Sequence, residues 1–163
     1  MVFGFGNPSR GDDAVGPLLV EALQQQMPSE QTEFLTDFQL QIEHALDLQQ
    51  RRLVLFVDAA VDCPAGFSFS RLWPKPDRSY SSHALSPAAL LYAYQTVILQ
   101  APPPSYLLGI AASEFELGAE LTITTRTSLA AAGRFAKRLL ATLELTYWEG
   151  MQSQVCEYQP ASG

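Results

Sequence analysis

The sequence has few basic residues, few cysteines and no long hydrophobic run. Of its 163 residues, 10 are Lys or Arg and 17 are Asp or Glu, so the formal net charge is −7. No basic stripe is present, and we therefore expect neither nucleic acid nor an anionic membrane as a partner. No apolar run reaches the ~18 residues that a membrane-spanning helix requires.

The two cysteines, Cys63 and Cys156, lie far apart and form no C-x-x-C pair. Two widely spaced cysteines are typical of a protein in a reducing compartment, and their spacing does not match a zinc-binding motif. The N-terminus lacks the basic segment and apolar core of a signal peptide, so we expect a cytoplasmic protein. A hydrophobic fraction of 47% can supply a full core, and the length fits one domain.

Glycine and acid are instead concentrated near the N-terminus. Residues 4–16 form the sequence GFGNPSRGDDAVG, between a short apolar segment and an amphipathic one. Glycine permits tight turns and close approach to a ligand, and adjacent carboxylates suit cations and proton transfer. A loop between a strand and a helix lies at the carboxyl end of the strand, where open α/β sheets bind ligands.

Apolar periodicity predicts strands that alternate with helices. We expect strands at 2–5, 32–36, 53–57, 67–73 (an edge strand) and 106–111, and helices at 14–26, 41–50 and 128–147. A further helix is predicted to begin at Pro87, behind a capping Ser86. This alternation predicts βαβ units and a mainly parallel sheet. In the helix at 41–50, we expect Ile42, Ala45 and Leu46 to share the buried side.

Three polar side chains are candidates for chemistry. Asp13 follows the first strand, Asp58 ends the most apolar strand, and His83 lies in a loop just before a helix. The carboxyl ends of neighbouring strands converge on one crevice. Two carboxylates and an imidazole there would form a divalent-metal site that is open to other ligands. The alternatives are that Asp12 and Asp13 cap a helix, that Asp58 binds loop amides, and that His83 is solvated.

A dinucleotide-binding loop is a competing interpretation. The spacing Gly4-x-Gly6-x-x-Ser9 resembles part of that fingerprint, and Asp37 could act as the ribose-binding acid. The third glycine is missing, however, and Pro8 has no amide donor. Two acids near the helix N-terminus would also repel a pyrophosphate, so we disfavour nucleotide binding. We interpret the second histidine, His44, as a surface residue among polar neighbours.

The pattern G-x-G-N-P-x-R-G-D-D-x-x-G over residues 4–16 resembles the N-terminal signature of the hydrogenase maturation endopeptidases. These enzymes cut a C-terminal extension from the large subunit of nickel–iron hydrogenases. Further features of the family follow in the same order, to about residue 145: Val57-Asp58-Ala59, Ser82-His83-x-x-Ser86-Pro87, Gly109-Ile110, Glu114, Gly118 and Leu121-Thr122. The resemblance implies a single α/β domain of the phosphorylase/hydrolase-like type, with a twisted, mainly parallel sheet, helices on both faces and one antiparallel edge strand. We expect this domain to cover residues 1–148, followed by a flexible tail over 149–163.

The resemblance also implies the site. Asp13, Asp58 and His83 are the metal-contacting positions that it implies. Our hypothesis is that the metal is nickel that the substrate carries and that Asp13 and Asp58 are the catalytic carboxylates, while Asp12 caps the helix and holds the loop. The implied partner is a nickel-loaded precursor of the hydrogenase large subunit, and we expect the protein to be a monomer. The alternative is a non-catalytic, nickel-sensing or chaperone-like module. Residues 38–41 replace a glycine-rich segment of the family, a departure that bears on substrate specificity.

Overall fold

Five strands form one sheet in the order β2–β1–β3–β5–β4 in the computed structural model, which describes residues 1–76 and 85–152. The strands β1, β2, β3 and β5 are parallel, and the edge strand β4 pairs antiparallel with β5. This arrangement confirms the predicted mainly parallel sheet with one antiparallel edge. The strand bounds are Val2–Phe5 (β1), Phe34–Asp37 (β2), Val54–Ala60 (β3), Phe67–Leu72 (β4) and Ser105–Ala111 (β5).

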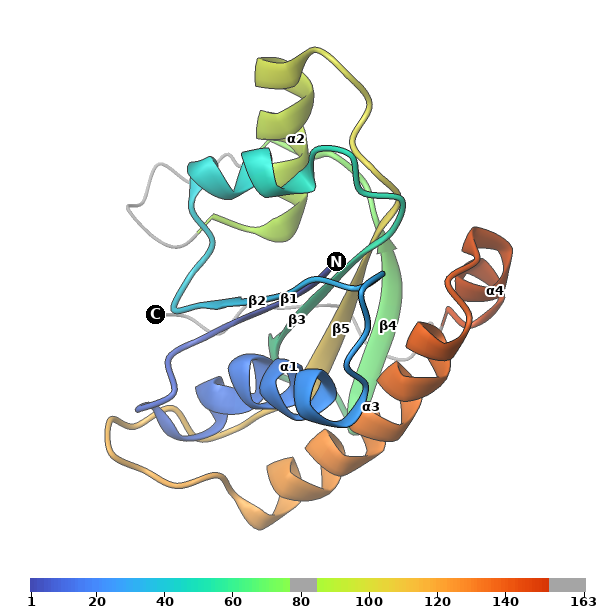
Figure 1. Ribbon diagram of the computed structural model, residues 1–163. Helices are drawn as coiled ribbons and strands as arrows, with labels where there is room; N and C mark the ends of the chain where they lie inside the picture. Colours follow the sequence, from blue (N-terminus) through green and yellow to red (C-terminus); the bar gives the residue numbers. More distant parts are fainter. Residues whose placement is uncertain (77–84, 153–163) are drawn as a thin grey trace.

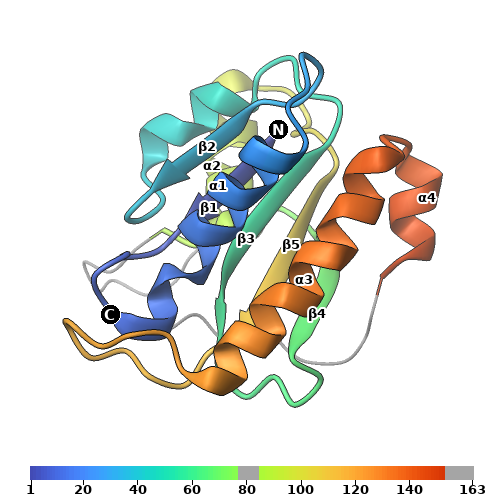
Figure 2. The same ribbon diagram turned by 60° about the horizontal axis from the view of Figure 1, so that its bottom comes forward.

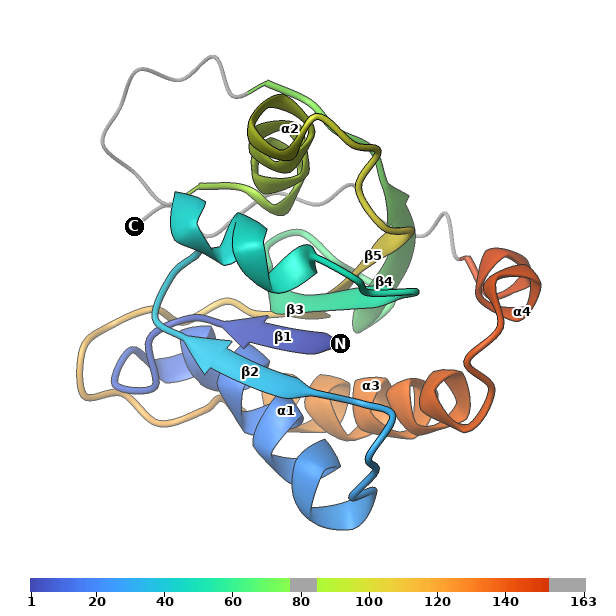
Figure 3. The same cartoon turned by 45° about the horizontal axis from the view of Figure 1, so that its top comes forward.

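Helices cover both faces of the sheet, as predicted (Figures 1 and 3). On one face, α1 (Val15–Gln26) and α3 (Ile123–Ala141) enclose a core that includes Leu19, Val57 and Ala136. On the other face, the 3₁₀ helix η2 (Ile42–Leu48) and α2 (Pro87–Ile98) enclose a second core. No helix in the described part of the chain is long and apolar enough to cross a membrane.

The central strand β3 is buried along its whole length. An unbroken apolar run is typical of a parallel strand that is covered on both faces. The strand is longer than predicted, because β5 continues to pair with it at Asp58, Ala59 and Ala60. The prediction that Asp58 ends this strand is therefore wrong.

Helix α3 begins at Ile123 rather than at the predicted Ser128. Its N-cap is Thr122, whose hydroxyl accepts a hydrogen bond from the Thr125 amide at 3.1 Å. The predicted single helix to residue 147 is in fact two helices, because α3 ends at Ala141 and α4 begins at Leu145 (Figure 2). The predicted start of α2 is confirmed, since Ser86 caps it.

The segment predicted as a helix over 41–50 is a shorter 3₁₀ helix. A 3₁₀ helix has three residues per turn, so residues three apart share a face. Ala45 and Leu48 accordingly enter the core and Leu46 is exposed. Ile42 is also exposed, although it lies three residues before Ala45, and it is the first residue of the helix. The prediction that Ile42, Ala45 and Leu46 share the buried side is wrong for Ile42 and Leu46.

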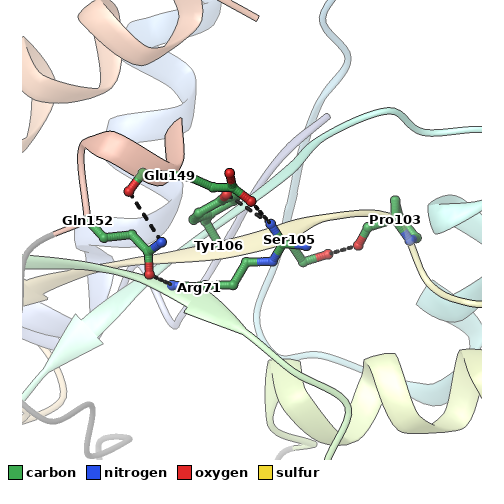
Figure 4. A network of polar contacts seen from close by, with 6 residues as sticks. All are labelled: Arg71, Pro103, Ser105, Tyr106, Glu149 and Gln152. Atoms are coloured by element: carbon green, nitrogen blue, oxygen red, sulfur yellow. Dashed lines mark hydrogen bonds and ion pairs between the residues drawn. The ribbon is translucent and has the colours of Figure 1, made fainter. Parts of the chain in front are cut away.

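The C-terminal helix α4 (Leu145–Gly150) is fixed to the sheet by both apolar and polar contacts. Trp148 is fully buried against Tyr106, with ring centroids 5.4 Å apart. Arg71 of β4 donates a hydrogen bond to the Tyr106 hydroxyl, lies 3.7 Å from the Glu149 carboxylate and donates from its amide to Gln152 (Figure 4). The described chain thus continues to Gln152, beyond the expected domain limit at 148, and residues 153–163 of the expected tail lie outside the described residues.

Candidate functional site

The loop after β1 turns tightly back onto the sheet. A single 3₁₀ turn, η1 (Gly11–Ala14), leads directly into α1. At Gly16 a side chain would overlap the carbonyl oxygen of Phe5 and approach that of Val57 to 2.8 Å, so only glycine lets α1 lie this close to β1 and β3. Gly6 has a φ of +140°, and a side chain there would overlap the Asp13 carbonyl oxygen. These two glycines therefore place η1 at the carboxyl end of β1.

Asp13 is partly exposed on this turn. One oxygen of its carboxylate accepts a hydrogen bond from the Asn7 amide at 2.8 Å, which fixes the side chain across the loop. A carboxylate has about four acceptor positions, so Asp13 retains capacity to bind a cation or a proton. The N-cap of α1 is Ala14, and no side chain caps that helix. The prediction that Asp12 or Asp13 caps α1 is wrong.

Asp12, by contrast, is fully buried. Its carboxylate accepts hydrogen bonds from three backbone amides and three hydroxyls of the segment that joins β5 to α3 and of the first turn of α3. The amides are those of Ser113 (3.0 Å), Glu114 (3.1 Å) and Thr122 (2.8 Å), and the hydroxyls are those of Ser113 (3.5 Å), Thr122 (3.2 Å) and Thr125 (2.8 Å). Burial raises the pKa of Asp12, but these hydrogen bonds outweigh it and leave the pKa below its usual value. The prediction that Asp12 holds the loop is confirmed.

Three further contacts join the same pair of loops. The Gly118 amide donates to the Ser9 carbonyl at 2.7 Å, and the Arg10 side chain donates to the Phe115 carbonyl at 3.2 Å. The Asp12 amide also donates to the Glu114 carbonyl at 2.8 Å. The loop that carries Asp13 is therefore fixed along much of its length by the segment before α3.

Asp58 is almost fully buried, and its carboxylate accepts a hydrogen bond from the Ala59 amide at 2.8 Å. The last residue pair between β1 and β3 is Gly4 with Val57, so Asp58 lies where β1 leaves the sheet. Side chains alternate along a strand. Because Phe56 belongs to the core under η2 and α2, Asp58 faces that same side.

Two of the three predicted site residues lie on elements that contact each other. Asp13 lies on η1, which packs against β3, the strand that carries Asp58. The third residue, His83, lies outside the described residues, although α2 begins only shortly after it, at Pro87. Within residues 1–76 and 85–152, no three His, Cys, Asp or Glu side chains gather closely enough to hold a metal ion.

His44 is not the surface residue that we predicted. Its side chain is only 17% exposed, and the ring meets Phe3 edge-on, with centroids 4.8 Å apart. Nδ1 accepts a hydrogen bond from the Gln41 amide at 2.9 Å, and Nε2 lies 3.2 Å from an Asp37 carboxylate oxygen. The other Asp37 oxygen accepts from the Phe38 amide. Asp37, the acid of the nucleotide-binding alternative, thus already has partners within the chain.

No protein-family model and no curated protein sequence matches this chain, but several solved structures do. The [NiFe] hydrogenase maturation protease HycI from Thermococcus kodakarensis KOD1 is similar over 86% of this chain and 91% of its own, with a TM-score of 0.69 and 21% identity. The hydrogenase maturating endopeptidase HybD from E. coli is similar over 86% and 91%, with a TM-score of 0.62 and 22% identity. The endopeptidase HycI from Escherichia coli covers 96% of both chains, with a TM-score of 0.65 and 16% identity. The chain therefore has the fold of the hydrogenase maturation proteases.

Proposed function

We propose that this protein is an endopeptidase that removes the C-terminal extension from the precursor of a nickel–iron hydrogenase large subunit. The observation that carries the proposal is the position of Asp13. Its carboxylate is partly exposed at the carboxyl end of β1, accepts one amide hydrogen bond and lies on a turn that packs against the strand of Asp58. The similar solved structures are hydrogenase maturation proteases, and the likeness covers most of both chains.

In this proposal the metal belongs to the substrate. The precursor arrives with nickel in place, and Asp13, Asp58 and His83 contact that nickel. Carboxylate and imidazole are suitable ligands for a borderline divalent metal. A precursor without nickel lacks the group that these residues bind, so the protein would discriminate against it. The partner is thus the nickel-loaded precursor, which a monomer of this protein would meet transiently.

Peptide hydrolysis requires activation of a water and a proton for the leaving amine. Asp13 has unused acceptor positions and can take a proton from a water. Asp58 is held by the Ala59 amide in an almost fully buried position, which suits a group that orients a ligand. The sequence contains no G-x-S-x-G turn and no H-E-x-x-H helix, which favours the carboxylates. The substrate's nickel would polarise the scissile carbonyl or a bound water.

The test is to mix the protein with nickel-loaded and nickel-free precursor and to measure the mass of the large subunit. Loss of a C-terminal peptide only from the loaded precursor supports the proposal. Unchanged mass with tight binding supports the second candidate, a non-catalytic nickel-sensing or chaperone-like module that uses the same three residues. Cleavage of both precursors would exclude nickel as the recognition element.

A further inference from the structure

The segment after β2 leaves the sheet beside the candidate site. The Gly6 amide, at the start of the loop that carries Asp13, donates a hydrogen bond to the carbonyl of Asp37 at 3.1 Å. The next residue, Phe38, is 64% exposed, whereas Leu40 is buried in the core under η2. Residues 38–41 therefore directly follow the residue that binds the start of the Asp13 loop, and they expose one large aromatic side chain to solvent.

His44 joins the two ends of this segment. It binds Asp37 at the end of β2 through Nε2 and the Gln41 amide at the start of η2 through Nδ1. A neutral imidazole has one N–H donor and one acceptor nitrogen. Both contacts are satisfied together only when the imidazole is neutral and its proton is on Nε2.

The surroundings of His44 determine what protonation does. Asp37 faces it from β2 and Phe3 from β1, while η2 itself carries Glu43 and Asp47. Helix α2, which packs on η2, has Tyr92 and Tyr94 but no charged residue. A second proton on the ring would strengthen the contact with Asp37. It would also place an N–H at Nδ1 against the N–H of Gln41, and that hydrogen bond would be lost.

We propose that His44 is a pH-sensitive positioning residue for residues 38–41. Neutral His44 holds this segment in place for recognition of the precursor, and protonation releases it at Gln41 while the Asp37 end stays bound. Imidazole is the side chain whose ordinary change of charge falls between about pH 5 and 8, and the two pH values of the experiment below are chosen on either side of its midpoint. The effect on recognition rests on the function proposed above, whereas the release itself does not.

Two substitutions separate the two roles of the ring. In His44→Asn the amide oxygen takes the place of Nδ1, so Gln41 keeps an acceptor that does not titrate. In His44→Gln the amide nitrogen reaches toward Asp37 and Gln41 loses its acceptor. Hydrogen exchange followed by NMR, corrected for intrinsic rates, gives the protection of the Gln41 amide at about pH 5.5 and about pH 7.5.

Wild-type protection at Gln41 is expected to fall ~5-fold at the lower pH, which is the effect of one lost hydrogen bond. In His44→Asn the protection of the Gln41 amide should be the same at both pH values. In His44→Gln that protection should be low at both pH values. Protection in the wild type that does not change with pH would overturn the proposal, and this result needs no substrate.

Cleavage of nickel-loaded precursor tests the link to recognition. The ratio of KM at the lower pH to KM at the higher pH is expected to be ~3–5-fold larger for the wild type than for His44→Asn. His83 is present in both proteins, so its own titration cancels in this comparison. Equal KM ratios would overturn the role in recognition. If the wild type cleaves no precursor, the proposed function fails, and the exchange experiment still decides whether His44 releases Gln41.

Discussion

Asp12 and Asp13 are neighbours in the chain, but their carboxylates bind different parts of the molecule. Asp12 is fully buried and binds the segment between β5 and α3, whereas Asp13 is partly exposed and accepts one hydrogen bond from Asn7 within its own loop. One acid therefore fixes the loop, and the other keeps acceptor positions for a ligand. The predictions below test this division and the chemistry proposed for it.

We expect Asp12→Asn to lower the free energy of unfolding by about 2–4 kcal/mol, because the new NH₂ group would oppose buried donors. Asp13→Asn should cost less than about 1 kcal/mol, since the amide oxygen can still accept from Asn7. Urea denaturation followed by circular dichroism measures the free energy of unfolding of both variants. Equal losses in the two variants would contradict the different roles of the two acids.

The contribution of Asp12 should depend on pH. Its folded pKa is lowered, so the stabilisation is fully present above the unfolded value of about 3.9 and is lost as pH falls through the folded value. The difference in unfolding free energy between wild type and Asp12→Asn should thus be constant above about pH 5 and should shrink below about pH 4. A difference that grows on acidification would show that the folded pKa is raised.

Gly16→Ala should destabilise the protein by about 3 kcal/mol, because the new methyl group would overlap the Phe5 carbonyl and push α1 off the sheet. The matched control is Gly133→Ala in α3, where the nearest atom is Leu19 Cδ1 at an ordinary 3.5 Å. That change should stabilise the helix by about 0.5–1 kcal/mol. Thermal unfolding of the two variants should therefore shift in opposite directions.

Asp13→Asn and Asp58→Asn should each lower the rate of precursor cleavage by ~100-fold or more if a carboxylate transfers the proton. The control is Asp62→Asn. Asp62 is exposed and has a φ of +54°, a conformation that Asn also adopts. Mass spectrometry of the large subunit measures the rate. Cleavage that survives both Asp13→Asn and Asp58→Asn would exclude the proposed mechanism.

His83→Ala should weaken binding of the nickel-loaded precursor and leave binding of the nickel-free form unchanged. Neutral imidazole is the form that binds a metal, so the affinity of the wild type should fall below about pH 6.5, the ordinary pKa of imidazole. Titration calorimetry with both precursors measures the two affinities. Full retention of affinity for the loaded precursor in His83→Ala would remove His83 from the site.

The sheet and the turn that carries Asp13 could be predicted because they follow from local patterns. The apolar run before Asp58 indicates a buried strand, Ser86 and Pro87 indicate a helix start, and the glycines of residues 4–16 indicate a tight turn. The start of α3 could not be predicted from the spacing of apolar residues, because Thr122 and Thr125 are polar. Both threonines are held by hydrogen bonds to Asp12, which lies near the other end of the chain.

The environment of His44 was missed for a similar reason. Its polar neighbours suggested solvent, but Asp37 and Gln41 bind both ring nitrogens. Leu46 was misassigned because a 3₁₀ helix repeats every three residues, whereas the prediction used the 3.6-residue period of an α-helix. Ile42 would share the face of Ala45 under either period, and it is exposed as the first residue of η2.

The hydrogen bonds of Asp12 connect positions 101 to 113 residues apart in the chain. Contacts between such distant positions carry the entropic cost of closing a long loop, and they require both segments to have been synthesised. The loop that carries Asp13 can thus reach its final conformation only once β5 and the start of α3 have been synthesised and have docked. A nascent chain that ends before residue 113 can form β1 and α1, but its acid loop lacks the partners of Asp12. The loop of the candidate site therefore gains all the partners of Asp12 only after the chain has been synthesised as far as Thr125.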